Sequence, residues 1–285
     1  MIDFRIDTFI DLAASLSYTQ TARNLNITQP AVTQHIQYLE ELYKSKLFSY
    51  KNKSLSITKE GELLLSYANS MKYNSNDIRN RLVNKKENLQ VKLGVTKTIG
   101  DYVISDFIIK AMSKDVIVDL YVNNTQALLN DLNNGKIDVA IIEGYFDKNM
   151  YDYKVLKSEE LVGICSKNHM IANKEIEFND IFSESLIERE DGSGTKEVLK
   201  NALLVKNYSL SCFSTRLIIS NFNVIKDLVA NNMGISFVYS PVANDCRLAT
   251  FRIKGIRIEH DFTMVWLKYT NNFLVDVIDR ELIKF

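Results

Sequence analysis

Apolar residues between positions 18 and 48 fall into two short groups with helical spacing, separated by a tight turn. The apolar positions of the two groups are Ala22, Leu25, Ile27, Val32, Ile36 and Leu39. Thr19 is expected to cap the first helix, and Asn26 suits the left-handed residue that ends it. Thr28 is expected to cap the second helix, with Pro30 in its first turn. This pattern is typical of units that push the start of the second helix into a DNA major groove, and an ordinary helical hairpin is the alternative.

The segments on either side of this helix pair extend the unit. The apolar residues that predict an amphipathic helix ahead of the pair are Phe4, Phe9, Ile10, Leu12 and Ala13. After Leu47 and Phe48, the sequence YKNKSLSIT combines polar turn residues with an alternating Leu55 and Ile57. The pattern predicts a three-helix unit with a basic two-stranded wing, followed by a helix that Thr58 caps.

A long amphipathic helix is predicted over residues 59–87, where no proline interrupts the pattern. Its apolar stripe consists of Leu63, Leu64, Tyr67, Ala68, Met71, Ile78 and Leu82. A helix of about 28 residues spans about 42 Å, which is more than a small wing domain can cover. A second copy of the chain is the simplest partner for this stripe. The alternative is a helix that packs back on its own chain.

From Gln90 onward, strand and helix patterns alternate. Short apolar runs at VKLGVT, VIVDLYVN and IDVAIIEG predict three strands, with helices that begin near Gly100 and at Thr125. This alternation predicts a parallel sheet with crossover helices, which is an α/β fold. Ligands of such sheets bind at the carboxyl ends of strands, near helix N-termini. The loops 95–100 and 123–126 lie at such places and supply hydroxyl groups.

A second α/β unit follows, with further strands in YKVLKSEELVGICSKNH and the segment GSGT at residues 192–195. Glycines let a ligand approach the backbone closely, and the hydroxyl groups and the helix N-terminus favour an anion. A glycine-containing turn with an ordinary cap is the alternative. The neighbouring acidic residues Glu188, Glu190 and Asp191 are interpreted as a solvated loop or as partners of Arg189.

The chain resembles the LysR-type transcriptional regulators along its whole length. The N-terminal match is carried by LSYTQTARNLNITQPAVTQHIQYLE, KLF and LSITKEGELLLSYA. The C-terminal match is carried by LGVTKTIG, NNTQALLNDLNNGKIDVAIIEG, LIEREDGSGTKEVL and LVANNMGISFV. The resemblance implies a winged helix-turn-helix DNA-binding domain at 1–58, a linker and dimerisation helix at 59–89, and an effector-binding domain at 90–285. It implies that the last domain holds two Rossmann-like α/β subdomains (91–162 plus 266–285, and 163–265), similar to periplasmic binding proteins.

The helix pattern and the resemblance together assign binding residues. DNA contacts are expected from Thr19, Thr28, Gln29, Pro30, Ala31, Thr33, Gln34, Lys51 and Lys53. Effector contacts are expected from Thr96, Thr98, Thr125, Ser193, Gly194 and Thr195, with Lys97 as the only basic residue close by. The TKTIG loop with EREDGSGT is most similar to the branch that includes regulators of sulfur assimilation, which implies a small, anionic, sulfur-related effector. The family also implies a homodimer or homotetramer on an inverted-repeat promoter site.

Composition and charge agree with this assignment. Residues 1–90 hold 12 Lys/Arg against 9 Asp/Glu, and the rest of the 285 residues hold 23 against 26. This asymmetry suits a DNA-binding segment joined to a sensing domain. Acidic residues in MIDFRIDTFIDL argue against a signal peptide, and no apolar run reaches the about 18–20 residues of a membrane helix. We therefore expect a cytoplasmic protein with no membrane partner.

Catalytic and metal chemistry are not expected. The three cysteines (Cys165, Cys212 and Cys246) lack paired spacing, and the three histidines (His35, His169 and His260) lack metal-ligand spacing. We therefore expect no disulfide, metal or cofactor. His35 is interpreted as a residue at the core edge or as a phosphate contact. The alternatives from other classes are a solute-binding protein and an α/β enzyme with an incidental helix-turn-helix.

Overall fold

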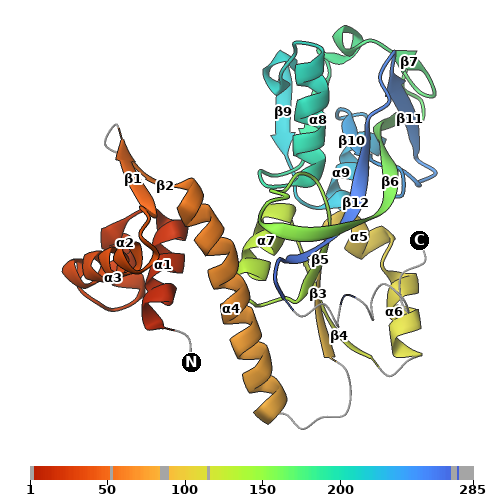
Figure 1. Ribbon diagram of the computed structural model, residues 1–285. Helices are drawn as coiled ribbons and strands as arrows, with labels where there is room; N and C mark the ends of the chain where they lie inside the picture. The colour runs from red at the N-terminus through yellow and green to blue at the C-terminus, as the bar shows by residue number, and fades with distance from the viewer. Residues whose placement is uncertain (1–2, 52–53, 84–89, 114–115, 271–274, 276–285) are drawn as a thin grey trace.

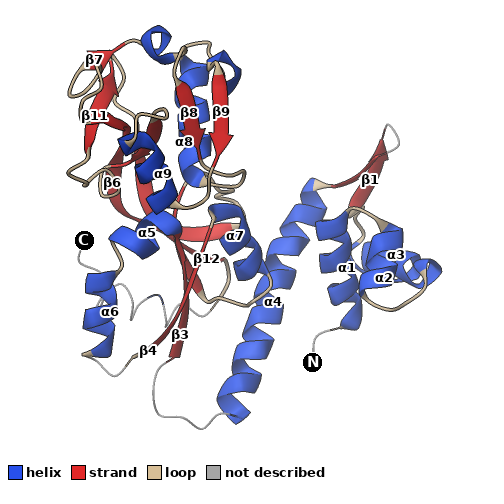
Figure 2. Ribbon diagram, turned by 180° about the vertical axis from the view of Figure 1, so that it is seen from behind, coloured by secondary structure: helices blue, strands red, loops and turns tan. Residues whose placement is uncertain are grey.

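The computed structural model describes residues 3–51, 54–83, 90–113, 116–270 and 275. Figure 1 shows three parts in chain order: a small helical domain with a hairpin, one long helix, and a larger two-lobed domain built on a sheet. Figure 2 shows the same arrangement from behind. Within these ranges, no helix has the length and apolar character needed to cross a membrane.

The N-terminal domain is a three-helix unit closed by a two-stranded wing, as predicted. Its elements are α1 (Phe4–Ser15), α2 (Tyr18–Asn24), α3 (Gln29–Tyr43), β1 (Phe48–Lys51) and β2 (Ser54–Ile57). Phe9, Leu12, Val32 and Leu39 are buried in its core. The rings of Phe9 and Phe48 meet edge to face with centroids 5.7 Å apart, so α1 packs directly against the wing.

The turn between α2 and α3 is formed as predicted, but the start of α2 is not. Asn26 has a left-handed backbone with φ 55°, and the Thr28 hydroxyl accepts a backbone N–H from the first turn of α3 at 3.3 Å. Ser17, not Thr19, caps α2, because Ser17 has an extended backbone and its hydroxyl accepts the N–H three residues later at 3.3 Å. Thr19 therefore lies inside the first turn.

The outer ends of α1 and α3 differ from the usual pattern. Phe4 is exposed because it occupies the first helical position at the rim of the domain, and Ile6 takes the buried position instead. Lys44 ends α3 in a left-handed conformation with φ 51°, where the sequence has no glycine. The backbone of Lys44 is therefore in a region that costs an ordinary side chain about 1–2 kcal/mol.

The linker helix is α4 (Lys59–Val83), and Thr58 caps it as predicted. The Thr58 hydroxyl accepts from the N–H of Gly61 at 3.0 Å and donates to the carbonyl of Lys46 at 2.6 Å. A Cβ atom at Gly61 would lie 2.3 Å from the Leu47 carbonyl oxygen, so the wing can approach α4 this closely only at a glycine. The last residues of the predicted helix, 84–87, lie outside the described residues.

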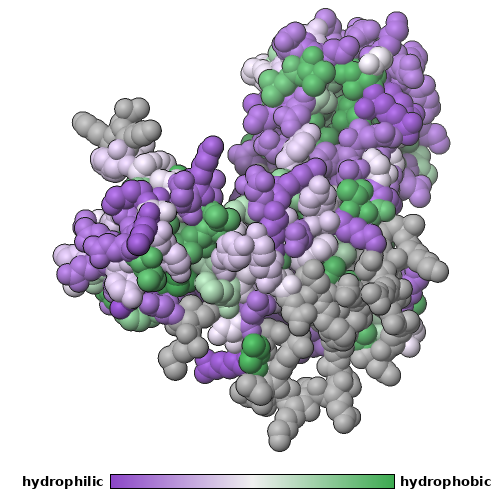
Figure 3. All heavy atoms as spheres, in the orientation of Figure 1, coloured by the Kyte–Doolittle hydropathy of each residue, from purple (hydrophilic) through white to green (hydrophobic). Residues whose placement is uncertain are grey.

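The predicted apolar stripe of α4 is split between a covered and an open part. Ala68 is buried and Leu64 packs against the core of the N-terminal domain, so part of the stripe does pack on its own chain. The exposed members are Leu63 (58%), Tyr67 (43%), Met71 (40%) and Ile78 (59%). Figure 3 shows apolar surface near the start of α4. The side chain of Leu82 is not among those described.

Among the described residues, the large domain is built on a mixed eight-stranded sheet. The strands are β3 (Gln90–Thr96), β4 (Ile117–Asn123), β5 (Val139–Glu143), β6 (Tyr151–Ser166), β7 (Glu175–Ile176), β10 (Ser236–Tyr239), β11 (Leu248–Ile253) and β12 (Glu259–Leu267). Their order is β4-β3-β5-β12-β6-β11-β7, with β10 paired to β6. β4, β3 and β5 are parallel, as predicted, whereas β12 runs antiparallel to β5 and β6. The α/β fold class is confirmed, and the sheet is mixed rather than wholly parallel.

Helices and a second small sheet surround this core. The helices are α5 (Lys97–Tyr102), α6 (Ser105–Met112), α7 (Thr125–Asn133), α8 (Gly194–Val205) and α9 (Phe222–Ala230), with 3-10 turns η1 (Phe178–Ile181) and η2 (Leu210–Cys212). The parallel strands β8 (Ser185–Glu188) and β9 (Thr215–Ile218) form the small sheet. α5 begins at Lys97 rather than near Gly100, because the chain turns directly from the extended Thr96 into the helix.

Two long strands join the lobes. β12 pairs with β5 on one side and with residues 151–160 of β6 on the other, and the rest of β6 pairs with β10 and β11. β6 is one continuous strand of 16 residues where the sequence suggested several. The predicted subdomain limits at 162/163 and 265/266 fall inside β6 and β12. A shared cluster of buried residues, which includes Ile141, Tyr239 and Phe262, extends through both lobes.

The linker helix also contacts the turn that follows β12. The rings of Tyr67 and Tyr269 stack with centroids 4.0 Å apart and planes 7° from parallel. The Ser70 hydroxyl donates to the carbonyl of Lys268, and the Asn74 amide donates to the carbonyl of Tyr269 at 3.3 Å. The strand shared by both lobes therefore ends directly on the helix that leads to the N-terminal domain.

Candidate functional site

The predicted DNA-contacting residues gather at the start of α3. Thr28, Gln29, Pro30 and Gln34 are exposed there, and Thr19 is exposed on the neighbouring α2. The Thr19 hydroxyl donates to the side-chain oxygen of Gln29 at 3.4 Å, so the polar groups of the two helices form one surface. This surface can present amide and hydroxyl groups to base edges.

The remaining predicted DNA contacts are less open or lie outside the described residues. Ala31 and Thr33 are partly exposed, and the Thr33 hydroxyl donates to the backbone carbonyl of Gln29 at 3.2 Å. The side chain of Lys51 and the whole of Lys53 lie outside the described residues, so their role stays a prediction.

His35 was interpreted as a core-edge residue or as a phosphate contact, and the structure places it at the core edge. Its Nδ1 atom lies 2.9 Å from the Thr8 hydroxyl, and its ring meets Phe4 edge to face at 5.0 Å. The histidine therefore fastens α3 to α1 rather than pointing to a phosphate.

The six predicted effector residues converge where the end of β5 meets the start of α8. We call this contact, with the loops that flank it, the inter-lobe seam. All six of these residues are buried; they are Thr96, Thr98, Thr125, Ser193, Gly194 and Thr195. Three come from the first lobe and three from the second, as expected for loops that face each other across a sheet edge.

In the first lobe, the three threonine hydroxyl groups are directed at Glu143. Thr96 and Thr98 each donate to the Glu143 carboxylate, the second at 2.9 Å. Thr125 donates to the backbone carbonyl of Glu143 at 2.7 Å. Glu143 itself is only 2% exposed. Sequence reasoning missed this residue, although a carboxylate at the end of the apolar strand IDVAII was a signal that could have been used.

The second lobe contacts the end of β5 closely where two glycines meet, Gly144 after β5 and Gly194 at the start of α8. A Cβ atom at Gly194 would lie 1.9 Å from the Glu143 carbonyl oxygen, and one at Gly144 would lie 2.7 Å from the Gly194 Cα. Only glycine permits this approach, so α8 begins directly against the end of β5. Ser193 is the N-cap of α8 but makes no side-chain cap hydrogen bond. The GSGT segment therefore forms the lobe contact itself.

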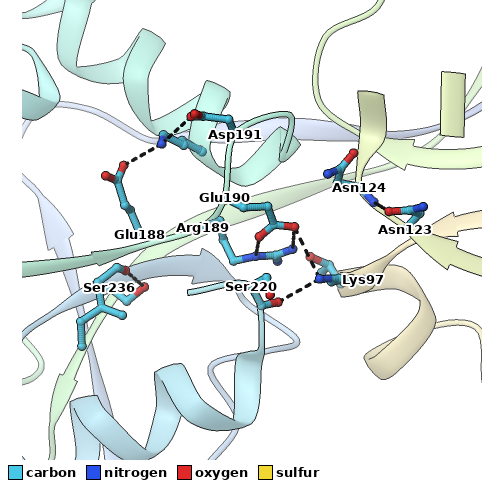
Figure 4. A network of polar contacts seen from close by, with 12 residues as sticks. Lys97, Asn123, Asn124, Glu188, Arg189, Glu190, Asp191, Ser220 and Ser236 are labelled. Carbon is cyan, nitrogen blue, oxygen red and sulfur yellow. Dashed lines mark hydrogen bonds and ion pairs between the residues drawn. The ribbon is translucent and has the colours of Figure 1, made fainter. Parts of the chain in front are cut away.

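The acidic residues beside GSGT pair with cations, and among the described residues Glu190 is the one that pairs with Arg189, while Asp191 stays exposed to solvent. Glu190 accepts from Arg189 at 2.9 and 3.2 Å and lies 3.5 Å from Lys97, whose ammonium also donates to the Ser220 carbonyl at 3.2 Å. Figure 4 shows the two cations meeting at the Glu190 carboxylate. Burial alone would raise the pKa of Glu190, but the hydrogen bonds from Arg189 hold it below its usual value. Arg189 is thus a second basic residue near the seam, which corrects the expectation for Lys97 alone.

The neighbouring carboxylates Glu188 and Asp191 also form ion pairs with basic side chains. Glu188 accepts from Arg216 at 2.6 Å and is 3.4 Å from Lys196, which also pairs with Asp191 at 2.7 Å. The hydrogen bond from Lys196 lowers the pKa of Asp191.

The electrostatic state of Glu143 follows from its burial. Loss of hydration raises the pKa of Glu143 to about 7, although the hydrogen bonds from Thr96 and Thr98 and the charge of Arg189 act in the opposite direction. Burial also raises the pKa of the nearby Tyr239 phenol, with a further contribution from Glu143. The seam therefore holds a carboxyl group that can change protonation near neutral pH.

Several buried polar atoms of the second lobe have no hydrogen-bond partner within the described part of the chain. They include Arg189 Nη1, Thr195 Oγ1 and Tyr239 OH. Most buried polar groups in proteins are paired, so each of these three atoms can still form a hydrogen bond with a ligand or a water. The Arg189 guanidinium also lies 4.3 Å from the Phe222 ring centroid, which orients it.

Two known protein-family models match this chain, one over each domain. A model described as "LysR substrate binding domain" matches residues 84–273, and one described as "Bacterial regulatory helix-turn-helix protein, lysR family" matches residues 5–62. The chain belongs to the LysR family. Its N-terminal domain is the DNA-binding domain of that family, and its large domain is the effector-binding domain.

Relatives and solved structures agree with this. The LysR-family chain is 27% identical over 236 residues to an uncharacterized HTH-type transcriptional regulator of Methanocaldococcus jannaschii, covering 81% of this chain and 79% of the relative. It is 25% identical over 236 residues to the HTH-type transcriptional regulator CysL of Bacillus subtilis, with 81% and 78% covered. Full-length BenM shares the fold with a TM-score of 0.59 at 16% identity, with 98% and 95% covered. The chain is thus a transcriptional regulator and not an enzyme.

A cavity of about 580 Å³ opens beside the seam of this LysR-type regulator. Its walls come from both lobes and include Lys97, Tyr102, Asn221, Phe222 and Lys226. Among the described residues, no group of three or more potential metal ligands comes together. The cavity therefore adjoins the seam through Lys97, which belongs to its wall.

Proposed function

We propose that this LysR-type regulator binds an inverted-repeat promoter site as a homodimer and responds to a small, sulfur-related anion at the inter-lobe seam. The observation that carries the effector part is the convergence of hydroxyl groups and unpaired donors from both lobes on one buried contact. We also propose that the protein acts in the cytoplasm, where a DNA-binding regulator can reach its promoter. Two such dimers would then pair to form a homotetramer.

For the DNA site, we propose that the start of α3 enters the major groove. Gln29, Ala31, Thr33 and Gln34 would face base edges, because a glutamine side chain can bond an adenine edge through two hydrogen bonds. Thr28 and Pro30 would line the groove edge, and Thr19, Lys51 and Lys53 would hold phosphates and orient the domain.

Replacement of Gln34 tests this docking. Gln34→Ala should relax sequence preference at one base pair, with a cost of about 1–3 kcal/mol there, because its exposed amide can no longer read a base. Binding to a library of operator variants measures the change. Glu41→Gln is the matched control, since Glu41 is exposed two turns further along α3 and should leave the preference unchanged. Unchanged specificity and affinity in Gln34→Ala would show that α3 docks in another way.

For assembly, we propose that the exposed part of the α4 stripe pairs with a second copy. Leu63, Met71 and Ile78 are exposed apolar residues that a partner helix would cover. The full chain should therefore sediment as a dimer or larger at micromolar concentration, and a monomer there would contradict the proposal. A dimer places two recognition helices about 34 Å apart or a multiple of this, which matches an inverted repeat.

For the effector, we propose a small anion held between Thr96, Thr98 and Thr125 of one lobe and Ser193, Gly194 and Thr195 of the other. The start of α8 offers backbone N–H groups and a favourable dipole. Arg189 and Lys97 add positive charge near the same place. The Synechocystis PCC6803 CcmR regulatory domain in complex with 2-PG has the same fold as this domain, with a TM-score of 0.58 at 19% identity, and supports a small-molecule ligand.

Two threonine variants test the effector site. Thr98→Ala and Thr195→Val each remove one hydroxyl group. Each should lower the affinity for the anion about tenfold or more, while DNA binding without effector stays intact. Calorimetry of the full chain with sulfate, sulfite, thiosulfate, nitrate, acetate and O-acetylserine measures this. Thr215→Val, at an exposed position on β9, is the control and should bind as the wild type does. The assignment fails if no anion of this set binds, or if those that bind do so undiminished in both variants.

A further inference from the structure

The Glu143 carboxyl group occupies the place where the effector anion would have to bind. Both of its carboxylate oxygens accept threonine hydroxyl groups, and its backbone carbonyl touches the start of α8. No cation among the described residues forms an ion pair with it. An ionised Glu143 would therefore repel an anion at short range, in surroundings that screen charge poorly.

The charged and titratable groups that face Glu143 cannot remove this repulsion by themselves. Arg189 is the nearest contributor of positive charge, but two of its nitrogens are engaged with Glu190. His260 accepts from the N–H of Gly144 at 3.4 Å, and its burial lowers its pKa, so it is neutral at pH 7. Tyr239 has a raised pKa and stays protonated. The carboxyl group of Glu143 is the member of this set that can change charge most easily near neutral pH.

The donors that remain free lie on the other side of the same contact. Arg189 Nη1, Thr195 Oγ1 and Tyr239 OH are buried and have no partner within the described residues. An anion among them needs one more donor from the first lobe. The Thr96 and Thr98 hydroxyl groups already donate to the Glu143 carboxylate. A protonated carboxyl group supplies that donor, because its O–H can point to the anion while its other oxygen still accepts a threonine hydroxyl.

We propose that the effector anion enters the seam together with one proton, and that Glu143 carries that proton and donates a hydrogen bond to the anion. The step balances in protons: for each anion bound, the Glu143 carboxylate takes one proton from solvent and becomes neutral, the anion keeps its own charge, and no covalent bond is made or broken apart from the new O–H. This inference rests on the anion site proposed above and adds the role of Glu143.

Proton-linked binding has a defined sign. Below the pKa of free Glu143 the carboxyl group is already protonated, so anion affinity should not depend on pH. Above pH 7 the proton must be taken up on binding, so affinity should fall about tenfold for each pH unit. Nitrate, sulfate, thiosulfate and acetate keep their own charge from pH 6 to pH 8.5, so they serve as probes.

Calorimetry of the full chain from pH 6 to pH 8.5 tests the inference, in two amine buffers of different ionisation enthalpy. The wild type should take up about one proton per anion at pH 8.5 and lose affinity as the pH rises. Glu143→Gln keeps the shape without the charge, so its affinity should be independent of pH and should exceed that of the wild type about tenfold or more at pH 8.5. Glu160→Gln, which removes a carboxylate from β6 that pairs with Arg252, is the control and should behave like the wild type.

The outcomes separate this inference from the anion site itself. Binding of none of the probes would overturn both. Binding that is independent of pH in the wild type would keep the anion site and overturn the role of Glu143. Proton uptake that persists in Glu143→Gln would assign the proton to another group, such as His260, and would also overturn it. Affinity of the anion probes that rises with pH would mean that a proton is released on binding, and it would also overturn the role of Glu143. If Glu143→Gln fails to fold, the buffer dependence of the wild type alone decides.

Discussion

The burial of one carboxyl group, Glu143, constrains the arrangement of the effector domain. A carboxylate without water needs hydrogen-bond donors, and Thr96 and Thr98 supply them because α5 begins directly at the end of β3. The same strand end must also meet α8, which is possible only because Gly194 has no side chain. The lobes therefore meet at a point that is polar, buried and closely packed. Such a contact responds to a change of charge or to a small ligand more strongly than an apolar contact would.

The route from this seam to the DNA-binding domain is short. β12 pairs with β5 beside Glu143 and with β6 of both lobes, and the turn after it stacks Tyr269 on Tyr67 of the linker helix. A shift of one lobe against the other moves β12 or bends it, and either change reaches α4 through that stack. The helix in turn packs on the N-terminal core through Leu64 and Ala68. Effector binding can therefore change the placement of the recognition helices only if it favours one lobe arrangement over another.

Local signals made the N-terminal domain and many element limits predictable from the sequence. Asn26 and Thr28 act within one helical turn of their own positions, and so does the cap that Thr58 gives to Gly61, so the local pattern is enough to predict these roles. The second bond of Thr58, to the Lys46 carbonyl, is not part of that pattern. The six predicted effector residues could be selected from the sequence for a related reason, because each follows a strand or starts a helix. Glu143 and Tyr239 were missed because their importance comes from contacts between β5, α8 and β10. These elements are far apart in the sequence, so a local pattern cannot show that they meet. The antiparallel course of β12 was missed for the same reason.

Hydrogen exchange of the full chain shows whether the buried Glu143 side chain helps to hold the contact between the two lobes. Glu143→Ala leaves the Thr96 and Thr98 hydroxyl groups without their acceptor and removes the charge opposite Arg189. The account predicts faster exchange in both 96–99 and 193–196, with the amides of α1–α3 unchanged. Faster exchange around β3 and β5 alone, with 193–196 as protected as in the wild type, would contradict it.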